Sequence, residues 1–172
     1  MIITSKLFAM KLTDGSVTIM KKIRLIIVED EPAILRGITN LIRGFDDVPI
    51  EICGTYTSAK NALEEIDSTN PKIIMTDVRM PVISGLDLIK VVRESGRECE
   101  YLIMSGYAEF EYARQAMKLD VSNYLLKPPR KTELKEALQA VCRKILLKEH
   151  DDFDKILRDI IFQDISTFRR MP

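Results

Sequence analysis

The sequence has few of the residues that metal centres and nucleophilic active sites commonly use. It contains a single histidine, His150, which excludes most zinc sites and most catalytic triads. The three cysteines, Cys53, Cys99 and Cys142, are far apart and odd in number, and they do not have the spacing of metal ligands. We therefore expect all three cysteines to be reduced residues of the core.

The chain also lacks a long apolar run and an excess of charge of one sign. No stretch approaches the roughly 18 to 20 apolar residues of a membrane span. Lys11 ends the short run Leu7–Met10 with no cleavage site after it, so residues 1–19 do not resemble a signal peptide. With 26 basic and 26 acidic residues, the protein has no global field that would draw it to nucleic acid or to a membrane surface. We expect a cytoplasmic protein that contacts no membrane and touches DNA only through a further domain.

The residues that are present alternate between short apolar runs and longer amphipathic segments. A chain of 172 residues with 46% hydrophobic content suits one domain with short extensions. Repeated strand–helix units predict a parallel sheet with helices on both faces, and continuous apolar runs agree with burial on both sides. The predicted strands are Ile23–Val28, Ile50–Tyr56, Ile73–Asp77, Tyr101–Met104 and Tyr124–Leu126.

Start and stop residues delimit the predicted helices. Pro32 suits the first turn of one helix, which Gly44 ends. Ser58 can cap the next helix, which Asn70-Pro71 closes, and Thr132 can cap the last.

Polar side chains follow four of the predicted strands. Glu29 and Asp30 follow the first, Asp77 ends the third, Ser105 follows the fourth and Lys127 follows the fifth. Because the carboxyl ends of parallel strands share one edge of the sheet, these side chains are expected to converge there.

Such a cluster suggests phosphoryl chemistry. Three carboxylates with reference pKa values of about 4 would repel one another, and Mg²⁺, which prefers oxygen ligands, would relieve that repulsion. Lys127 and Ser105 would supply a positive charge and a hydroxyl for phosphoryl oxygens. The reaction indicated is attack by a carboxylate on a phosphoryl group.

Four motifs in combination resemble the receiver domain of a two-component response regulator. They are Val-Glu-Asp-Glu-Pro (28–32), Thr-Asp-Val-Arg-Met-Pro (76–81), Met-Ser-Gly-Tyr (104–107) and Tyr-Leu-Leu-Lys-Pro (124–128). The resemblance covers roughly residues 22–148, and residues 105–113 resemble receivers attached to AraC-type DNA-binding output domains. The implied fold is α/β and flavodoxin-like, a (βα)5 doubly wound parallel sheet with strand order 2-1-3-4-5, here with a C-terminal helical extension.

The resemblance implies a phosphoacceptor and its metal ligands. Asp77 matches the phosphoacceptor, Asp30 a direct ligand of Mg²⁺, and Glu29 a ligand that acts through water. Asp77 itself and the backbone carbonyl of Arg79 would be further ligands of the metal.

It also implies a switch. Ser105 matches the switch hydroxyl, Tyr124 the switch aromatic and Lys127 the family's lysine, with a cis bond to Pro128. Asp120 stands where related sequences often have glycine, and aspartate tolerates the left-handed conformation better than most residues.

The implied partner is a sensor histidine kinase whose phosphohistidine supplies the phosphoryl group. The face formed by the fourth helix, fifth strand and fifth helix would then change its pairing, which allows a homodimer on phosphorylation and control of an output, transcription above all. Self-phosphorylation and autodephosphorylation would be the only chemistry, so the chain is not expected to be an enzyme.

Three alternatives remain open at the level of sequence. The chain could be a stand-alone receiver that acts through protein contacts, or a receiver that works unphosphorylated. It could also be an aspartyl-phosphate phosphatase of the haloacid dehalogenase kind, although that family needs a second aspartate where this sequence has Arg79.

The two ends form separate segments in this interpretation. Residues 1–20 would be a leader, either disordered or a hairpin around Thr13-Asp14-Gly15, and residues 21–148 the receiver. Residues 149–172 would fold back on the receiver, or form a helical linker that dimerises or leads to an output domain. Their apolar residues have helical spacing: Phe153, Ile156, Leu157, Ile160, Ile161, Ile165 and Phe168.

Overall fold

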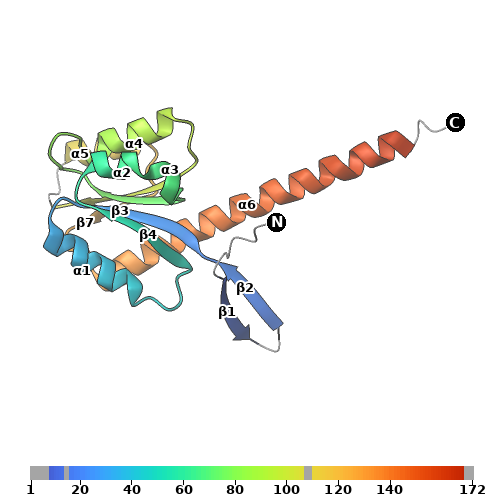
Figure 1. Ribbon diagram of the computed structural model, residues 1–172, viewed down its shortest axis with the longest axis horizontal. Helices are drawn as coiled ribbons and strands as arrows, with labels where there is room; N and C mark the ends of the chain where they lie inside the picture. Colours follow the sequence, from blue (N-terminus) through green and yellow to red (C-terminus); the bar gives the residue numbers. More distant parts are fainter. Residues whose placement is uncertain (1–7, 14–15, 107–109, 169–172) are drawn as a thin grey trace.

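A parallel sheet forms the centre of the molecule in this computed structural model, which describes residues 8–13, 16–106 and 110–168 (Figure 1). Its five strands have the order β4-β3-β5-β6-β7, so the predicted order 2-1-3-4-5 and the flavodoxin-like fold are confirmed. The strands of this sheet are β3 (Ile23–Val28), β4 (Ile50–Tyr56), β5 (Ile73–Asp77), β6 (Glu100–Ser105) and β7 (Asn123–Leu126).

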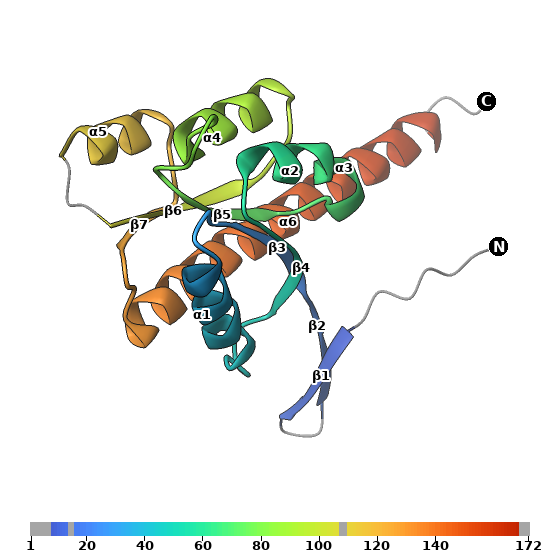
Figure 2. The ribbon, with the colours of Figure 1, turned by 60° about the vertical axis from the view of Figure 1, so that its left-hand side comes forward.

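Helices cover both faces of this sheet (Figure 2). Alternate residues of β3 show why, since Leu25 and Ile27 belong to one buried cluster while Ile26 and Val28 belong to the other. The first cluster packs α1 (Pro32–Arg43) and the start of α6 (Lys131–Phe168). The second packs the helices of the opposite face: α2 (Ala59–Glu64), α3 (Ile66–Thr69), α4 (Gly85–Glu94) and α5 (Phe110–Lys118).

The helix boundaries follow most of the predicted signals. The Gly44 amide donates to the Asn40 carbonyl at the end of α1, and the Ser58 hydroxyl accepts a hydrogen bond at the start of α2. The helix predicted after Ser58 is interrupted at Glu65 and continues as α3. The predicted capping role of Thr132 is wrong, because α6 begins at Lys131 and Thr132 lies inside its first turn.

Two local backbone predictions are confirmed. Asp120 has a φ of 44°, so aspartate does occupy the left-handed region before β7. The bond between Lys127 and Pro128 is cis.

A separate two-stranded hairpin precedes the receiver fold. Strands β1 (Phe8–Thr13) and β2 (Ser16–Lys21) pair antiparallel, with Leu12 opposite Val17. This is the hairpin alternative for the leader, although residues 1–7 and the turn residues 14 and 15 lie outside the described residues. The hairpin extends away from the five-stranded sheet (Figure 1).

The last helix is longer than the charged run at residues 148–152 suggests. Helix α6 continues through that run without a break and extends away from the sheet, so the fold-back alternative is not the arrangement observed (Figures 1 and 2). The predicted division at residue 148 falls within this helix. Within the described part of the chain, no helix is both long and apolar enough to cross a membrane.

Candidate functional site

Three carboxylates meet at the carboxyl edge of the sheet. Glu29 and Asp30 directly follow β3, and Asp77 ends β5, the strand that pairs beside β3. Val28 lies opposite Thr76 in this pairing, which brings the residues after each of them to the same level. One oxygen from each carboxylate lies within 4.8 Å of the others.

Lys127 joins this cluster from the end of β7. Its Nζ lies 2.6 Å from Oε2 of Glu29 and 2.9 Å from Oδ2 of Asp77. The side chain is only 8% exposed and that of Glu29 is fully buried, so water screens this ion pair weakly. The Lys127 amide donates to the Ser105 carbonyl at 2.8 Å, which fixes where the lysine leaves the strand.

Burial and charge have opposing effects on the pKa values of Glu29 and Lys127. Burial raises the pKa of Glu29 above its usual value, although the neighbouring Lys127 ammonium opposes that shift. Burial alone would lower the pKa of Lys127, but its contacts with Glu29 and Asp77 outweigh that effect, and its pKa is raised.

The donor set fits a hard divalent cation. The three carboxylates carry a formal charge of −3 and Lys127 contributes +1, which leaves −2 on the cluster. Carboxylate oxygens are the ligands that Mg²⁺ prefers, and a single Mg²⁺ would balance that charge. The residues present are therefore suited to the metal that the sequence predicts.

The other predicted site residues surround this cluster. Ser105 is buried at the end of β6, the strand beside Asp77. Tyr124 is half-buried in β7 opposite Ile103, and it packs against the cluster that includes α4. Arg79 lies two residues beyond Asp77 and is exposed. The structure thus brings the side chains of Glu29, Asp30, Asp77 and Lys127 together. Ser105, Tyr124 and Arg79 lie on neighbouring segments of the chain.

Gly85 is a site residue that sequence reasoning missed. It is the first residue of α4, and its amide donates to the Val78 carbonyl at 3.0 Å. A Cβ atom at this position would overlap the backbone carbonyl oxygen of Asp77. The one sequence feature that indicates this close approach is the presence of a glycine directly after the capping residue Ser84.

Gly85→Ala is expected to destabilise the protein by about 2 kcal/mol, because the added methyl group must displace the backbone of Asp77. Gly37→Ala is the matched control. It lies inside α1, where an added Cβ meets nothing within 4 Å, and it should instead stabilise by about 0.5–1 kcal/mol. Urea unfolding measures both variants, and equal midpoints would contradict this account of Gly85.

Comparisons with known proteins agree with the fold. The family model described as "response regulator receiver domain" matches residues 25–139. The uncharacterized transcriptional regulatory protein YesN of Bacillus subtilis is 33% identical over 122 residues, which cover 71% of this chain and 33% of that protein. The transcriptional regulatory protein HptR of Staphylococcus aureus is 28% identical over 145 residues, covering 78% of this chain and 56% of that protein.

Solved structures include similar domains. The REC domain of AraT, a response regulator from Geobacillus stearothermophilus, is 30% identical with a TM-score of 0.65, covering 73% of this chain and 97% of that one. A DNA-binding response regulator of the LuxR family from Staphylococcus aureus is 27% identical with a TM-score of 0.64, covering 70% and 98%. Against the curated relatives, the chain spans between a third and just over half of their length.

Proposed function

Because this chain belongs to the family of response regulator receiver domains, we propose that Asp77 accepts a phosphoryl group from a partner histidine kinase. The observation that carries the proposal is the cluster in which Glu29, Asp30 and Asp77 bring their carboxylate oxygens within 4.8 Å of one another beside Lys127. Groups held this close together can orient the acceptor carboxylate and the phosphoryl group for transfer, which lowers the entropic part of the barrier.

In the proposed reaction a carboxylate oxygen of Asp77 attacks the phosphorus of a phosphohistidine. The new bond from oxygen to phosphorus makes an acyl phosphate on Asp77, and the bond from phosphorus to the imidazole nitrogen breaks. The imidazole leaves as the neutral ring, with a proton on one of its two nitrogens. Glu29 and Asp30, with the backbone carbonyl of Arg79, would hold Mg²⁺, which supplies positive charge to the phosphoryl oxygens.

Lys127 and Ser105 would then respond to the new charge. The Lys127 ammonium already contacts Asp77, and it can pair with a phosphoryl oxygen while it keeps its contact with Glu29. The Ser105 hydroxyl lies at the end of the adjacent strand, where a small movement would let it donate to another phosphoryl oxygen. Tyr124, two residues before Leu126 in β7, would follow that movement.

The face that would report this change consists of α5, β7 and the start of α6. Met117 of α5 and Leu126 of β7 are exposed apolar side chains on it. A movement of Tyr124 between these elements would alter their packing, with a coupling of about 1–3 kcal/mol typical of such switches. Control of transcription is the proposed output, since the relatives YesN and HptR are named as transcriptional regulatory proteins.

A groove beside the site offers room for a phosphodonor protein. It has a volume of about 570 Å³ and lies between α1 and residues 127–129, the segment that follows β7. Apolar side chains of α1, Ile34 and Leu41, face Pro128 and Pro129 across it, with Lys127 at one end. An apolar surface next to the acceptor matches the apolar core that protein–protein interfaces have, so it suits a protein donor.

The direct test is phosphoryl incorporation from acetyl phosphate, measured by intact-protein mass spectrometry. Incorporation of one phosphoryl group per molecule is expected with Mg²⁺, and its loss is expected when a chelator removes the metal, because the −2 cluster would then repel the anionic donor. Equal incorporation with and without Mg²⁺ would overturn the proposed metal site, and none under either condition would overturn the phosphoacceptor.

A further inference from the structure

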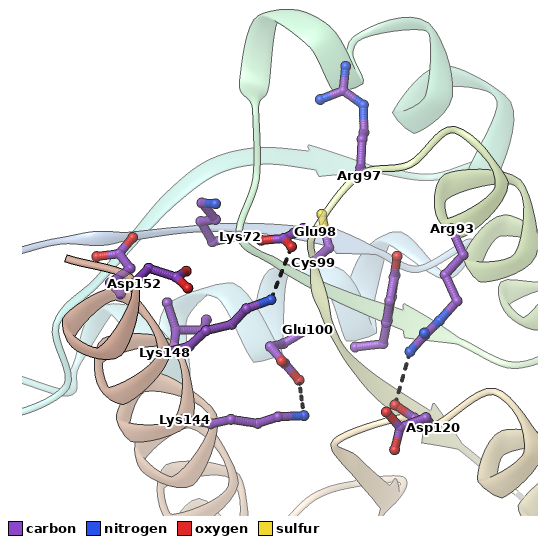
Figure 3. Close-up of a pocket in the computed structure, with 13 residues that line it drawn as sticks. Lys72, Arg93, Arg97, Glu98, Cys99, Glu100, Asp120, Lys144, Lys148 and Asp152 are labelled. Carbon is purple, nitrogen blue, oxygen red and sulfur yellow. Dashed lines mark hydrogen bonds and ion pairs between the residues drawn. The ribbon is translucent and has the colours of Figure 1, made fainter. Parts of the chain in front are cut away.

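Helix α6 serves two parts of the molecule. Its first half packs on the sheet through the buried residues Leu134, Ala137, Leu138, Val141, Cys142 and Ile145. Its second half continues to Phe168 beyond the edge of the sheet in both views (Figures 1 and 2). Glu149 and Asp152 still line a pocket together with Lys72 and Glu98 of the receiver, and the helix then continues past them (Figure 3).

Two partly exposed ion pairs join α6 to the sheet where the helix leaves it. Lys144 lies 2.7 Å from Glu100, and Lys148 lies 3.1 Å from Glu98 (Figure 3). Glu100 begins β6 and also accepts a hydrogen bond from Ser122. Two successive turns of α6 are thus tied to the edge of the sheet opposite the phosphoacceptor, which favours the extended course of the helix.

Large apolar side chains are exposed as the helix departs. Leu147 is 61% exposed and Phe153 is 58% exposed, and Leu146 beside them is 38% exposed. The sequence continues this series along the helix, and we call the whole set the α6 stripe: Leu146, Leu147, Phe153, Ile156, Leu157, Ile160, Ile161, Ile165 and Phe168.

The α6 stripe is not a continuation of the surface that packs on the sheet. At 3.6 residues per turn, the positions from Phe153 to Phe168 centre about 120° around the helix axis from the positions between Leu134 and Ile145. The receiver thus lies on a different side of α6 from the stripe. Two copies could bring their stripes together while each sheet stays outside the contact.

The spacing of these positions is that of a coiled coil. Residues 146, 150, 153, 157, 160 and 164 alternate steps of four and three, which is the a/d pattern of about three heptads. His150 and Asp164 occupy two of these positions, and polar residues there define register at a cost in stability. Such a repeat favours association with a second helix of the same repeat.

We propose that α6 forms a parallel coiled coil with a second copy of this chain. Four of the positions that flank the seam, Leu147, Ile156, Ile161 and Phe168, are apolar and select no oppositely charged partner, which supports self-association. Glu149 and Asp154 also flank the seam, and their like charges meet in a parallel pair, which lowers its stability. In the parallel arrangement Ile156 of one copy is next to Ile161 of the other. Both receivers then lie at one end of the coil, and the association does not depend on the phosphoryl site.

Sedimentation equilibrium of the full chain at micromolar to submillimolar concentration tests the proposal. The expected mass is twice 19.7 kDa for the wild type and 19.7 kDa for Leu157→Glu. Lys155→Glu is the matched control, since position 155 lies opposite the seam, and it should leave the dimer intact. A wild type that stays monomeric throughout, or a Leu157→Glu variant that dimerises like the wild type, would overturn the proposal.

Disulfide trapping tests the orientation. Oxidised Phe153→Cys should give a covalent dimer in a parallel coil, whereas Lys155→Cys should not. Asp77→Asn should dimerise as the wild type does, which separates this contact from the phosphoacceptor. A dimer that trapped equally at both positions would refute the parallel register, and one abolished by Asp77→Asn would refute its independence.

Discussion

Asp77→Asn is expected to abolish phosphoryl incorporation from acetyl phosphate. The amide keeps the shape of the side chain but removes the anionic oxygen that attacks phosphorus, and it removes one carboxylate from the cluster of three. Intact-mass spectrometry should then find the unmodified mass alone under conditions in which the wild type gains one phosphoryl group. Because the substitution is isosteric, the fold should remain intact.

Asp46→Asn provides the matched control for this experiment. Asp46 is exposed in the loop that leads from α1 to the amino end of β4, away from the carboxyl ends of the strands, so its loss should leave incorporation at the wild-type level. Undiminished incorporation in Asp77→Asn would exclude Asp77 as the acceptor. Release of many equivalents of phosphate from a small phosphate ester by the wild type would favour a phosphatase instead.

The strand ends could be predicted from the sequence because the physics is local. A parallel sheet buried on both faces requires continuous apolar runs, so Ile73–Asp77 and its neighbours are recognisable, and polar residues at their carboxyl ends must gather at one edge. The order of the strands was predicted from the resemblance that the motifs carry. Hydrophobic periodicity does not give this order, because it does not show on which side of a strand the next strand pairs.

Other features depend on contacts that no local pattern contains. The close approach of Gly85 to the Asp77 carbonyl exists only once α4 has docked beside β5. The sequence analysis also did not predict that α6 continues without a break, because the charged run at residues 148–152 interrupts the apolar pattern. Lys148 in that run pairs with Glu98 from a distant segment, and this pair could not be foreseen from helical spacing.

Lys127→Ala is expected to be strongly destabilising. Removal of the ammonium leaves Glu29, which is fully buried, and Asp77 without their shared cation, and loss of one partner from a buried ion pair costs about 4 kcal/mol. Lys135→Ala is the matched control, because Lys135 pairs with Asp47 at 2.8 Å in a partly exposed setting where the loss should be below about 1 kcal/mol. Urea unfolding without divalent cations measures both, and equal losses would contradict the role assigned to Lys127.

Metal binding by the same variant separates loss of the lysine from collapse of the site. Without Lys127 the three carboxylates carry a formal charge of −3 instead of −2, so a folded Lys127→Ala should bind Mg²⁺ at least as tightly as the wild type. Added Mg²⁺ should therefore recover more stability in the variant than in the wild type, because the cation replaces the missing positive charge. A variant that Mg²⁺ fails to stabilise would show that Lys127 organises the carboxylates rather than neutralising them.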